Sequence, residues 1–307
     1  MAEDISIKQY PVFEKGIFEN HPALFDPYFH NHPDHQKKKY RKAKKNLPKY
    51  EENYTWQVIT GPGFCGSIHS GTGKIFHGVM TDATHPVYNS DCMYINLPQR
   101  LFAISDPPGI TTLSRDLIIQ LDRLLQTESD ANLEALINEV NRNAGTGVRD
   151  RATLTLVHFP SGNPGKALAL LSGDSYLFQG NVINQQISRL EASPNRWGTP
   201  NAYFEMQEVD IKEGDFFVLA SDGISAIRPR SNNLNLDETI LKMATSDSRN
   251  FAFNIARNSN EIIEEAIAGK TRTVFGGGDD VSVILIEPEK LQPAPAQQSY
   301  ILGGYIL

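Results

Sequence analysis

Short apolar segments rich in β-branched and aromatic residues recur along this chain in consecutive runs. Those with the length and composition of β-strands are WQVIT, KIFHGVM, CMYINL, RLFAIS, ATLTLVHF, ALALLSG, SYLFQG, YFEMQEVD, DFFVLAS and VSVILIE. Helical periodicity covers residues 111–129 and 131–143, and further helices are predicted at about 236–246 and 250–268. Strands in runs, interrupted by paired helices, predict an α+β fold rather than alternating βαβ units.

The 307 residues allow one large domain or two ordinary ones, and 40% of them are hydrophobic, which suffices for a buried core. No apolar run reaches the ~18 residues of a membrane span. The acidic N-terminus lacks the apolar stretch of a secretory signal peptide, and two cysteines are too few for a disulfide framework. We expect a cytoplasmic monomer without a transmembrane segment. Export by a signal-peptide-independent route is the alternative.

The formal net charge of -7 combines two opposed features. Residues 37–49 hold eight basic residues and no acidic one, so the rest of the chain sums to about -15. A body this acidic argues against nucleic-acid binding. The basic run suits a solvated helix or linker, or contact with an anionic surface. The excess of carboxylates directs attention to where the aspartates stand.

Five aspartates stand at the ends of predicted strands or in tight turns. Asp106 follows RLFAIS, Asp222 follows DFFVLAS, Asp279 precedes VSVILIE, Asp91 precedes CMYINL, and Asp174 lies in the turn between ALALLSG and SYLFQG. If neighbouring strands bring their ends together, these carboxylates converge, and hard divalent cations would relieve their repulsion. The alternative for each single aspartate is a turn residue, because Asp-Gly and Gly-Asp pairs are common in turns.

Several segments together resemble one enzyme family. FAISDPPG is similar to a strand-then-Asp motif, VLASDGISA to a strand followed by Ser-Asp-Gly, and GGDDVSVILI to a C-terminal strand motif. YNSDCMYI, GTGVRDRATL, ALALLSGDSYLFQG and NRWGTPN are similar to further motifs of the same family. In these segments, which stand in family order over about residues 54–288, the chain resembles the metal-dependent, type 2C (PPM) serine/threonine protein phosphatases.

The resemblance implies a four-layer α-β-β-α sandwich of two antiparallel sheets flanked by helices, with a two-metal centre at one edge. By position, Asp106 would bridge two divalent cations, Mg²⁺ or Mn²⁺. Asp222 and Asp279 would hold the first cation, and the backbone carbonyl of Pro107 would help to hold the second.

The resemblance also implies a reaction and a substrate. Asp91 would orient a metal-activated water that attacks phosphoserine or phosphothreonine in a phosphoprotein. Asp174 matches the position that holds a third, weaker ion, and Asp280 would share that work.

The run after the bridging aspartate departs from the family pattern. Members usually have Asp-Gly-His-Gly or Asp-Gly-Met-Gly, whereas this chain has Asp106-Pro107-Pro108-Gly109. Pro107 still offers a carbonyl oxygen, although its ring fixes φ and so restricts where that oxygen points. Pro108 replaces the histidine proposed as a general acid in some members.

The early motif departs as well. Ser90 stands where an acidic residue is common, and no arginine stands a few residues upstream of Asp91, where members of the family use one to bind the substrate phosphate. His85 is the nearest candidate for that role, with an ordinary loop histidine as the alternative. These departures motivate a second reading, in which the chain is a pseudophosphatase-type binding module with the same fold and weak or no activity.

The resemblance divides the chain into three predicted parts. Residues 1–53 form an N-terminal extension that contains the basic run, residues 54–288 form the phosphatase-like domain, and residues 289–307 form a C-terminal tail. The two end segments would dock a partner, cover an edge strand or act as an export signal, and simple surface packing is the alternative.

Overall fold

The computed structural model describes most of the predicted phosphatase-like domain and parts of both end segments. The described residues are 4–12, 55–71, 89–109, 111–128, 132–144, 151–193, 195–199, 202–226, 235–260, 262–267, 270–275, 279–295 and 298–304. The basic run 37–49 and His85 lie outside them.

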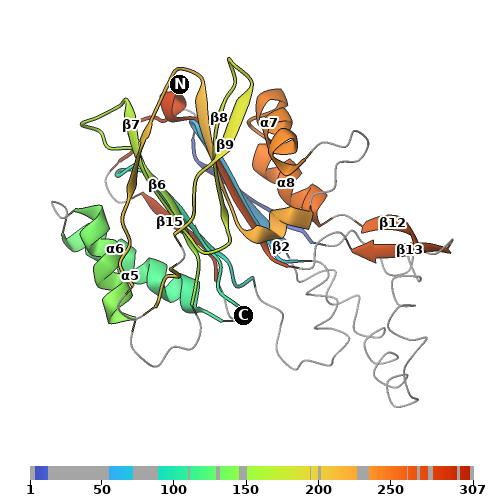
Figure 1. Cartoon of the computed structure of the whole chain (residues 1–307), viewed down its shortest axis with the longest axis horizontal. Coiled ribbons are helices and arrows are strands. Elements are labelled where there is room, and N and C mark those ends of the chain that lie inside the picture. The colour runs from blue at the N-terminus through green and yellow to red at the C-terminus, as the bar shows by residue number, and fades with distance from the viewer. Residues whose placement is uncertain are drawn as a thin grey trace, which may run out of the picture.

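Two antiparallel sheets form the centre of the molecule (Figure 1). The seven-stranded sheet has the order β1 (Ser6–Pro11), β2 (Thr55–Gly61), β3 (Phe64–His69), β14 (Val281–Ile286), β11 (Asp215–Ala220), β8 (Tyr176–Asn181) and β9 (Gln186–Arg189). The six-stranded sheet has the order β10 (Gln207–Asp210), β7 (Lys166–Ser172), β6 (Leu154–His158), β5 (Leu101–Ser105), β4 (Cys92–Asn96) and β15 (Ser299–Gly303).

Helices cover the outer face of each sheet (Figure 1). The helices α5 (Leu113–Thr127) and α6 (Leu133–Asn143) pack on the six-stranded sheet, and α7 (Leu236–Ser246) and α8 (Phe251–Ser259) pack on the seven-stranded sheet. Short 3₁₀ turns, η2 (Asp222–Ala226) and η3 (Pro288–Lys290), follow β11 and β14. The expected four-layer α-β-β-α sandwich is confirmed.

Strand alternation explains why the central strands are apolar on both faces. On β5, Phe102 and Ile104 belong to the core between the sheets, whereas Leu101 and Ala103 pack against α5 and α6. Successive side chains of a strand point to opposite faces, so a strand in the middle of four layers must be apolar at nearly every position. Burying each large apolar side chain contributes about 1.5–3 kcal/mol.

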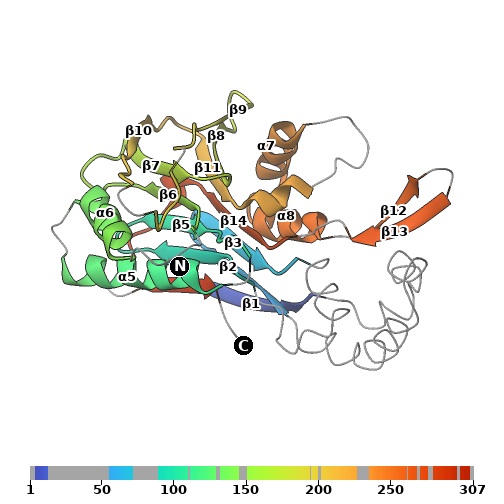
Figure 2. The ribbon, with the colours of Figure 1, turned by 60° about the horizontal axis from the view of Figure 1, so that its bottom comes forward.

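Both end segments supply edge strands. β1 pairs with β2 from Ser6 opposite Thr60 onwards, and β15 pairs with β4 until Gly303 lies opposite Cys92. Figure 2 shows β1 beside β2 at the edge of its sheet. Edge coverage, one of the roles considered for the ends of the chain, is therefore present in the structure.

One predicted helix is wrong in its second half. The periodicity at 250–268 predicts a single helix, but α8 ends at Ser259, and β12 (Ile262–Ile267) pairs antiparallel with β13 (Lys270–Phe275). The β-branched pair Ile262-Ile263 favours an extended backbone. Pairing with β13 supplies the backbone hydrogen bonds that a longer helix would have made.

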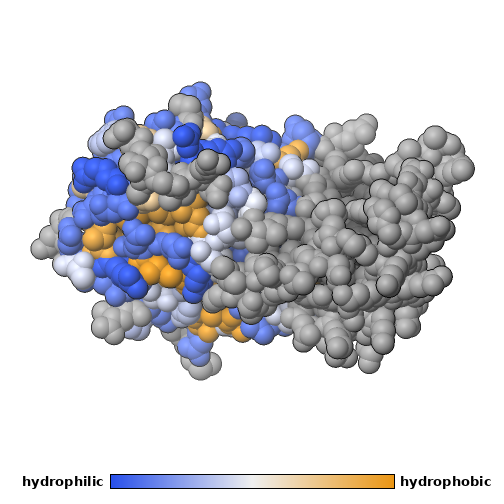
Figure 3. All heavy atoms as spheres, turned by 90° about the horizontal axis from the view of Figure 1, so that it is seen from below, coloured by the Kyte–Doolittle hydropathy of each residue, from blue (hydrophilic) through white to orange (hydrophobic). Residues whose placement is uncertain are grey.

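The surface of the described residues is mixed in character. Seen from below, apolar areas are interrupted by hydrophilic ones (Figure 3). Large apolar side chains that are exposed in the described part of the chain are Ile7, Val182, Ile183 and Tyr203. Among these described residues, no helix is both long and apolar enough to cross a bilayer.

Candidate active site

Four aspartates of the predicted constellation lie at the ends of strands from both sheets. Asp106 directly follows β5, Asp91 directly precedes β4, Asp222 follows β11, and Asp279 stands shortly before β14. Burial raises the pKa of the Asp106 carboxyl far above its usual range, and the negative charges of Asp91, Asp222 and Asp279 raise it further. The other three carboxylates therefore lie near enough to Asp106 for their charges to act on it, and all four stand at strand ends of the sandwich.

The backbone of Asp106 is fixed by Thr153. The amide of Asp106 donates to Oγ1 of Thr153 at 3.0 Å, and the amide of Thr153 donates to the carbonyl oxygen of Asp106 at 2.8 Å. The hydroxyl of Ser105 lies 2.7 Å from the Thr153 carbonyl, to which it donates. These bonds continue the β5–β6 ladder past Ser105 and place Asp106 at the rim of the sheet. Pro107, the next residue, is buried.

Asp91 is held from both sides although it lies at the start of a strand. Only 1% of Asp91 is exposed, and its amide donates to Oδ1 of Asn89 at 3.0 Å. The hydroxyl of Ser282 on β14 donates to Oδ2 of Asp91 at 2.8 Å. Because β4 and β14 belong to different sheets, this bond joins the two sheets at the site.

In the Ser-Asp-Gly segment after β11, specific contacts explain why Ser221 and Gly223 stand on either side of Asp222. Ser221 donates its amide to the carbonyl of Ser282 at 2.9 Å and accepts the amide of Ser282 on its hydroxyl at 2.9 Å. At Gly223, a Cβ atom would lie 2.0 Å from the carbonyl oxygen of Asp280, so no larger residue fits without a backbone shift. Asp222 is thereby held against β14.

Asp280 is committed to backbone contacts. Its Oδ1 accepts the amide of Gly71 at 3.1 Å, and its Oδ2 accepts the amide of Ser90 at 2.8 Å. Only 1% of Asp280 is exposed, whereas its neighbour Asp279 is an exposed residue. Asp280 therefore ties the end of β3 and the segment that carries Asp91 to the start of β14.

Asp174 lies in the β7–β8 turn and forms an ion pair. Its Oδ2 lies 2.5 Å from Nη2 of Arg196. The turn is seated against Thr153, because the hydroxyl of Ser175 donates to Oγ1 of Thr153 at 2.8 Å, and a Cβ at Gly173 would lie 2.8 Å from the Thr153 methyl. Asp174 therefore lies near Thr153, the residue that fixes the backbone of Asp106, and it is already paired with the cationic side chain of Arg196.

The donor set suits hard divalent cations, but the side chains are not arranged as a finished site. Carboxylate and carbonyl oxygens are the ligands that Mg²⁺ and Mn²⁺ prefer. Within the described residues, no three acidic, histidine or cysteine side chains stand close enough together to form a ready-made metal-binding group.

Cysteine chemistry does not compete with this arrangement. Burial raises the pKa of both Cys65 and Cys92 to about 12. Their thiols keep their protons at neutral pH, and the thiolate is the nucleophilic form. Although Cys92 is next to Asp91 in the chain, it packs in the core under α5 and α6.

No family model matches the sequence, and neither does any curated protein. Solved structures do match the fold. The PPM Ser-Thr phosphatase MsPP from Mycobacterium smegmatis, in complex with cacodylate, superposes with a TM-score of 0.51 at 16% identity, covering 73% of this chain and 97% of that chain. The serine/threonine phosphatase PstP/Ppp from Mycobacterium tuberculosis gives 0.51 at 15% identity, covering 75% and 98%.

This chain has the PPM phosphatase fold. A further match is the catalytic domain of the serine/threonine protein phosphatase PstP, in complex with two manganese ions, with a TM-score of 0.52 at 17% identity, covering 75% of this chain and 98% of that chain. Because the matched chains are covered almost completely, the likeness spans their whole sandwich rather than one sheet.

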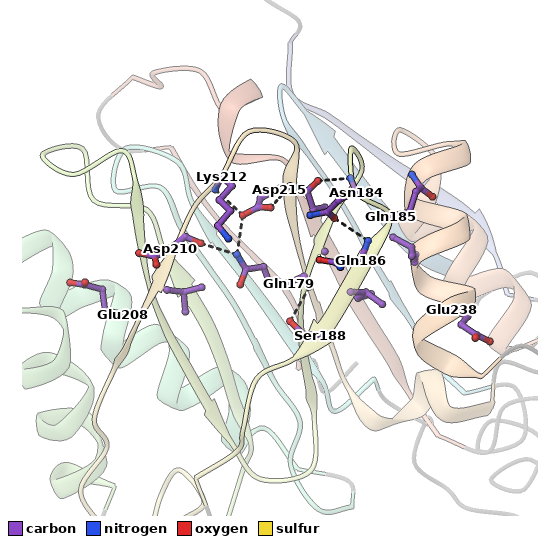
Figure 4. Close-up of a pocket in the computed structure, with 15 residues that line it drawn as sticks. Gln179, Asn184, Gln185, Gln186, Ser188, Glu208, Asp210, Lys212, Asp215 and Glu238 are labelled. Carbon is purple, nitrogen blue, oxygen red and sulfur yellow. Dashed lines mark hydrogen bonds between the residues drawn. The ribbon is translucent and has the colours of Figure 1, made fainter.

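A groove of this PPM-type sandwich lies at the Asp215 end of β11. This polar groove of about 830 Å³ is lined by the edges of both sheets and by α7 (Figure 4). Its buried carboxylate, Asp215, accepts hydrogen bonds from Asn181, from Gln179 and from the amide of Lys212. Asp215 and Asp222 stand at opposite ends of the strand, about 20 Å apart at ~3.3 Å per residue. The groove is therefore separate from the Asp106 site.

The structure brings together Asp91, Asp106, Asp222 and Asp279, with Pro107 and Asp280 beside them. Asp174 lies in the β7–β8 turn, which contacts Thr153 through Ser175. His85 lies outside the described residues. Sequence reasoning missed the side chains that hold the constellation: Ser282, Thr153 and Arg196. All three residues stand in segments that the sequence analysis singled out, namely VSVILIE, ATLTLVHF (its first Thr) and NRWGTPN. Their partners are far away in the sequence, so the segments alone do not reveal these contacts.

Proposed function

We propose that this chain is a metal-dependent phosphatase that hydrolyses phosphoserine and phosphothreonine in proteins. The observation that carries the proposal is the convergence of four carboxylates from both sheets, those of Asp91, Asp106, Asp222 and Asp279, at one edge of a PPM-type sandwich. Clustered anionic oxygens favour hard divalent cations. The PstP catalytic domain, which has the same fold, holds two manganese ions, and this supports Mn²⁺ or Mg²⁺ as the cofactor.

Asp106, Asp222, Asp279 and the carbonyl of Pro107 would hold two cations. Bound there, the cations would lower the pKa of a water molecule and stabilise the charge that develops on the phosphoryl group. A third ion at Asp174 would have to displace the guanidinium of Arg196, which already pairs with that carboxylate.

The chain's own residues orient the reactants. Asp91 would accept a hydrogen bond from the attacking water, and the bond from Ser282 fixes its carboxylate for that task. Thr153 fixes the backbone from which the Asp106 carboxylate extends. We propose that Asp280 positions Ser90 and Gly71 rather than binding a cation, because ligation would break two buried hydrogen bonds.

The test is hydrolysis of a phosphoserine peptide with Mn²⁺, with Mg²⁺ and with a chelator. We expect activity that the chelator abolishes and that Asp106→Asn and Asp222→Asn each reduce at least about 100-fold, since each removes a carboxylate charge that would hold the catalytic cations. Asp210→Asn, an exposed carboxylate paired with Lys166, is the control and should change nothing. Wild-type activity that is absent or no higher than the residual activity of the two site variants would instead support the pseudophosphatase interpretation.

Other features of the proposal rest on sequence. We propose a cytoplasmic monomer with a phosphoprotein substrate, a catalytic unit within residues 54–288, and a basic run at 37–49 that contacts an anionic surface. Light scattering on the purified chain tests the oligomeric state, and sedimentation with anionic vesicles tests the surface contact. The His85 phosphate contact is tested by His85→Ala, which should raise KM if the contact exists.

A further inference from the structure

A phosphomonoester that approaches this site meets several carboxylates and needs a cationic partner from the chain. Arginine is best suited, because its planar guanidinium donates two parallel hydrogen bonds to phosphate oxygens. The sequence contains no arginine between residues 55 and 91, ahead of the first aspartate of the site. An arginine that binds the phosphate would therefore come from a different segment of the chain.

The sheet register places Arg196 in line with Asp106. Ala152 and Trp197 form an antiparallel bridge, with N–H to O distances of 2.9 and 2.8 Å, so Arg196 stands opposite Thr153. On its other side, Thr153 makes the two bonds to Asp106. Neighbouring strands lie about 4.8 Å apart, so the backbones of Arg196 and Asp106 are about 10 Å apart, with Thr153 between them.

Strand alternation sets the face on which Arg196 lies. Ala152 and Trp197 belong to the cluster under α5 and α6, so their neighbours Thr153 and Arg196 face the opposite side, between the sheets. Asp106 faces the same side, because Phe102 and Ile104 of its strand belong to the core between the sheets. All three side chains therefore open toward the edge where Asp222 and Asp279 lie.

Asp174 orients the guanidinium. The ion pair joins Nη2 of Arg196 to Oδ2 of Asp174, and the side chains are 34% and 55% exposed, so both are open to a ligand. A guanidinium has five N–H donors, and this contact uses one of them. The turn that carries Asp174 is itself seated on Thr153 through Ser175. Arg196 is thus held beside the site with donors to spare.

We propose that Arg196, oriented by Asp174, binds the phosphate group of the substrate beside Asp106. This inference rests on the proposed phosphatase function and adds a residue that the early motif does not supply. Arg196 is the binding residue, and Asp174 is a positioning residue that acts through it. The phosphate would lie between the guanidinium of Arg196 and the cations that the Asp106 carboxylate would hold, on the two sides of Thr153.

The test compares Arg196→Ala, Arg196→Lys and Asp174→Asn with the wild type at saturating Mn²⁺. KM is measured for a phosphoserine peptide, and the affinity for inorganic phosphate is measured by inhibition and by calorimetry. Arg196→Ala removes charge-assisted hydrogen bonds to the phosphate and should weaken both affinities by about 10- to 100-fold. Arg196→Lys should lie between Arg196→Ala and the wild type, and Asp174→Asn should shift both in the same direction by less.

Arg189→Ala is the matched control, because Arg189 also pairs with an aspartate, Asp237, at a half-exposed position on β9. It should leave both affinities unchanged. Affinities within twofold of wild type in Arg196→Ala would overturn the inference, as would a wild-type chain that binds no phosphate. If the wild type binds phosphate through Arg196 but does not hydrolyse the peptide, the binding site stands and the phosphatase proposal fails.

Discussion

Ser282 Oγ donates a 2.8 Å hydrogen bond to Oδ2 of Asp91 and so joins β14 of the seven-stranded sheet to β4 of the six-stranded sheet. Both residues are almost fully buried. The bond from Ser282 fixes the orientation of the Asp91 carboxylate, although Asp91 and Ser282 belong to different sheets. Several further bonds of this kind hold the residues of the site in place.

Ser282→Ala should lower kcat for the phosphopeptide by about tenfold, because losing a hydrogen bond to a buried carboxylate is worth about 1.5–3 kcal/mol and frees Asp91 to turn. Ser67→Ala is the matched control. Ser67 is a buried hydroxyl on the adjacent strand β3 and has no hydrogen-bond partner in the described part of the chain. It should leave kcat unchanged, and an equal loss in both variants would contradict this role.

Substitution of the neighbours Asp279 and Asp280 should affect different properties, Mn²⁺ affinity for Asp279 and folding stability for Asp280. Asp280→Ala leaves two buried amide donors without an acceptor, at about 1–3 kcal/mol each, and should lower the free energy of unfolding in urea. Asp279→Ala removes an exposed carboxylate and should chiefly weaken Mn²⁺ binding in calorimetry. The assignment of roles fails if Asp280→Ala unfolds like the wild type while losing Mn²⁺ affinity.

Gly303 lets the C-terminal strand reach the site. Its φ is 74°, and a Cβ there would lie 2.3 Å from the carbonyl oxygen of Asp91. Gly303→Ala should therefore lower the melting temperature and also the activity, because relieving the clash moves either β15 or Asp91. Gly162→Ala is the control, since a Cβ there meets open space. Unchanged activity in Gly303→Ala would show that β15 does not support Asp91.

Stability should fall on acidification through His69. Burial lowers the pKa of His69 to about 4, although its ring hydrogen-bonds the carbonyl of Ser70 at 2.6 Å. Between the unfolded pKa of 6.5 and about 4, the unfolded chain binds one more proton than the folded chain, so stability is complete above 6.5 and declines as the pH falls.

The slope from this single proton is about 1.4 kcal/mol per pH unit. Urea unfolding of the wild type and His69→Asn between pH 7 and pH 4.5 isolates this contribution, because the other titrating groups are common to both. The difference in the free energy of unfolding between the wild type and His69→Asn should become smaller as the pH falls. A constant gap would contradict the assignment.

Local patterns predicted the parts of the fold that local physics decides. Asp106 after RLFAIS and Asp222 after DFFVLAS were placed correctly at strand ends, because apolar strands and turn residues are visible in the sequence. The contacts that make a site are between distant segments, such as Thr153 with Asp106 and Ser282 with Asp91. Neither leaves a periodicity that a single sequence can reveal.

The same limit applies to segments whose structure depends on pairing with another strand. β1 and β15 are short edge strands whose pairing partners lie about 50 and 200 residues away, so their pattern alone resembles a loose tail. The segment 262–267 has helix-compatible residues and becomes a strand because 270–275 pairs with it. In both cases strand pairing, which the segment's own residues do not reveal, decides the structure.

Calorimetric titration of Mn²⁺ into the wild-type chain tests the central claim most directly, because the convergence of carboxylates underlies every step proposed. The account predicts two tight sites per chain, with loss of tight binding in Asp106→Asn and unchanged binding in Asp210→Asn. Absence of tight binding to the wild type, or equal binding by Asp106→Asn, would contradict it.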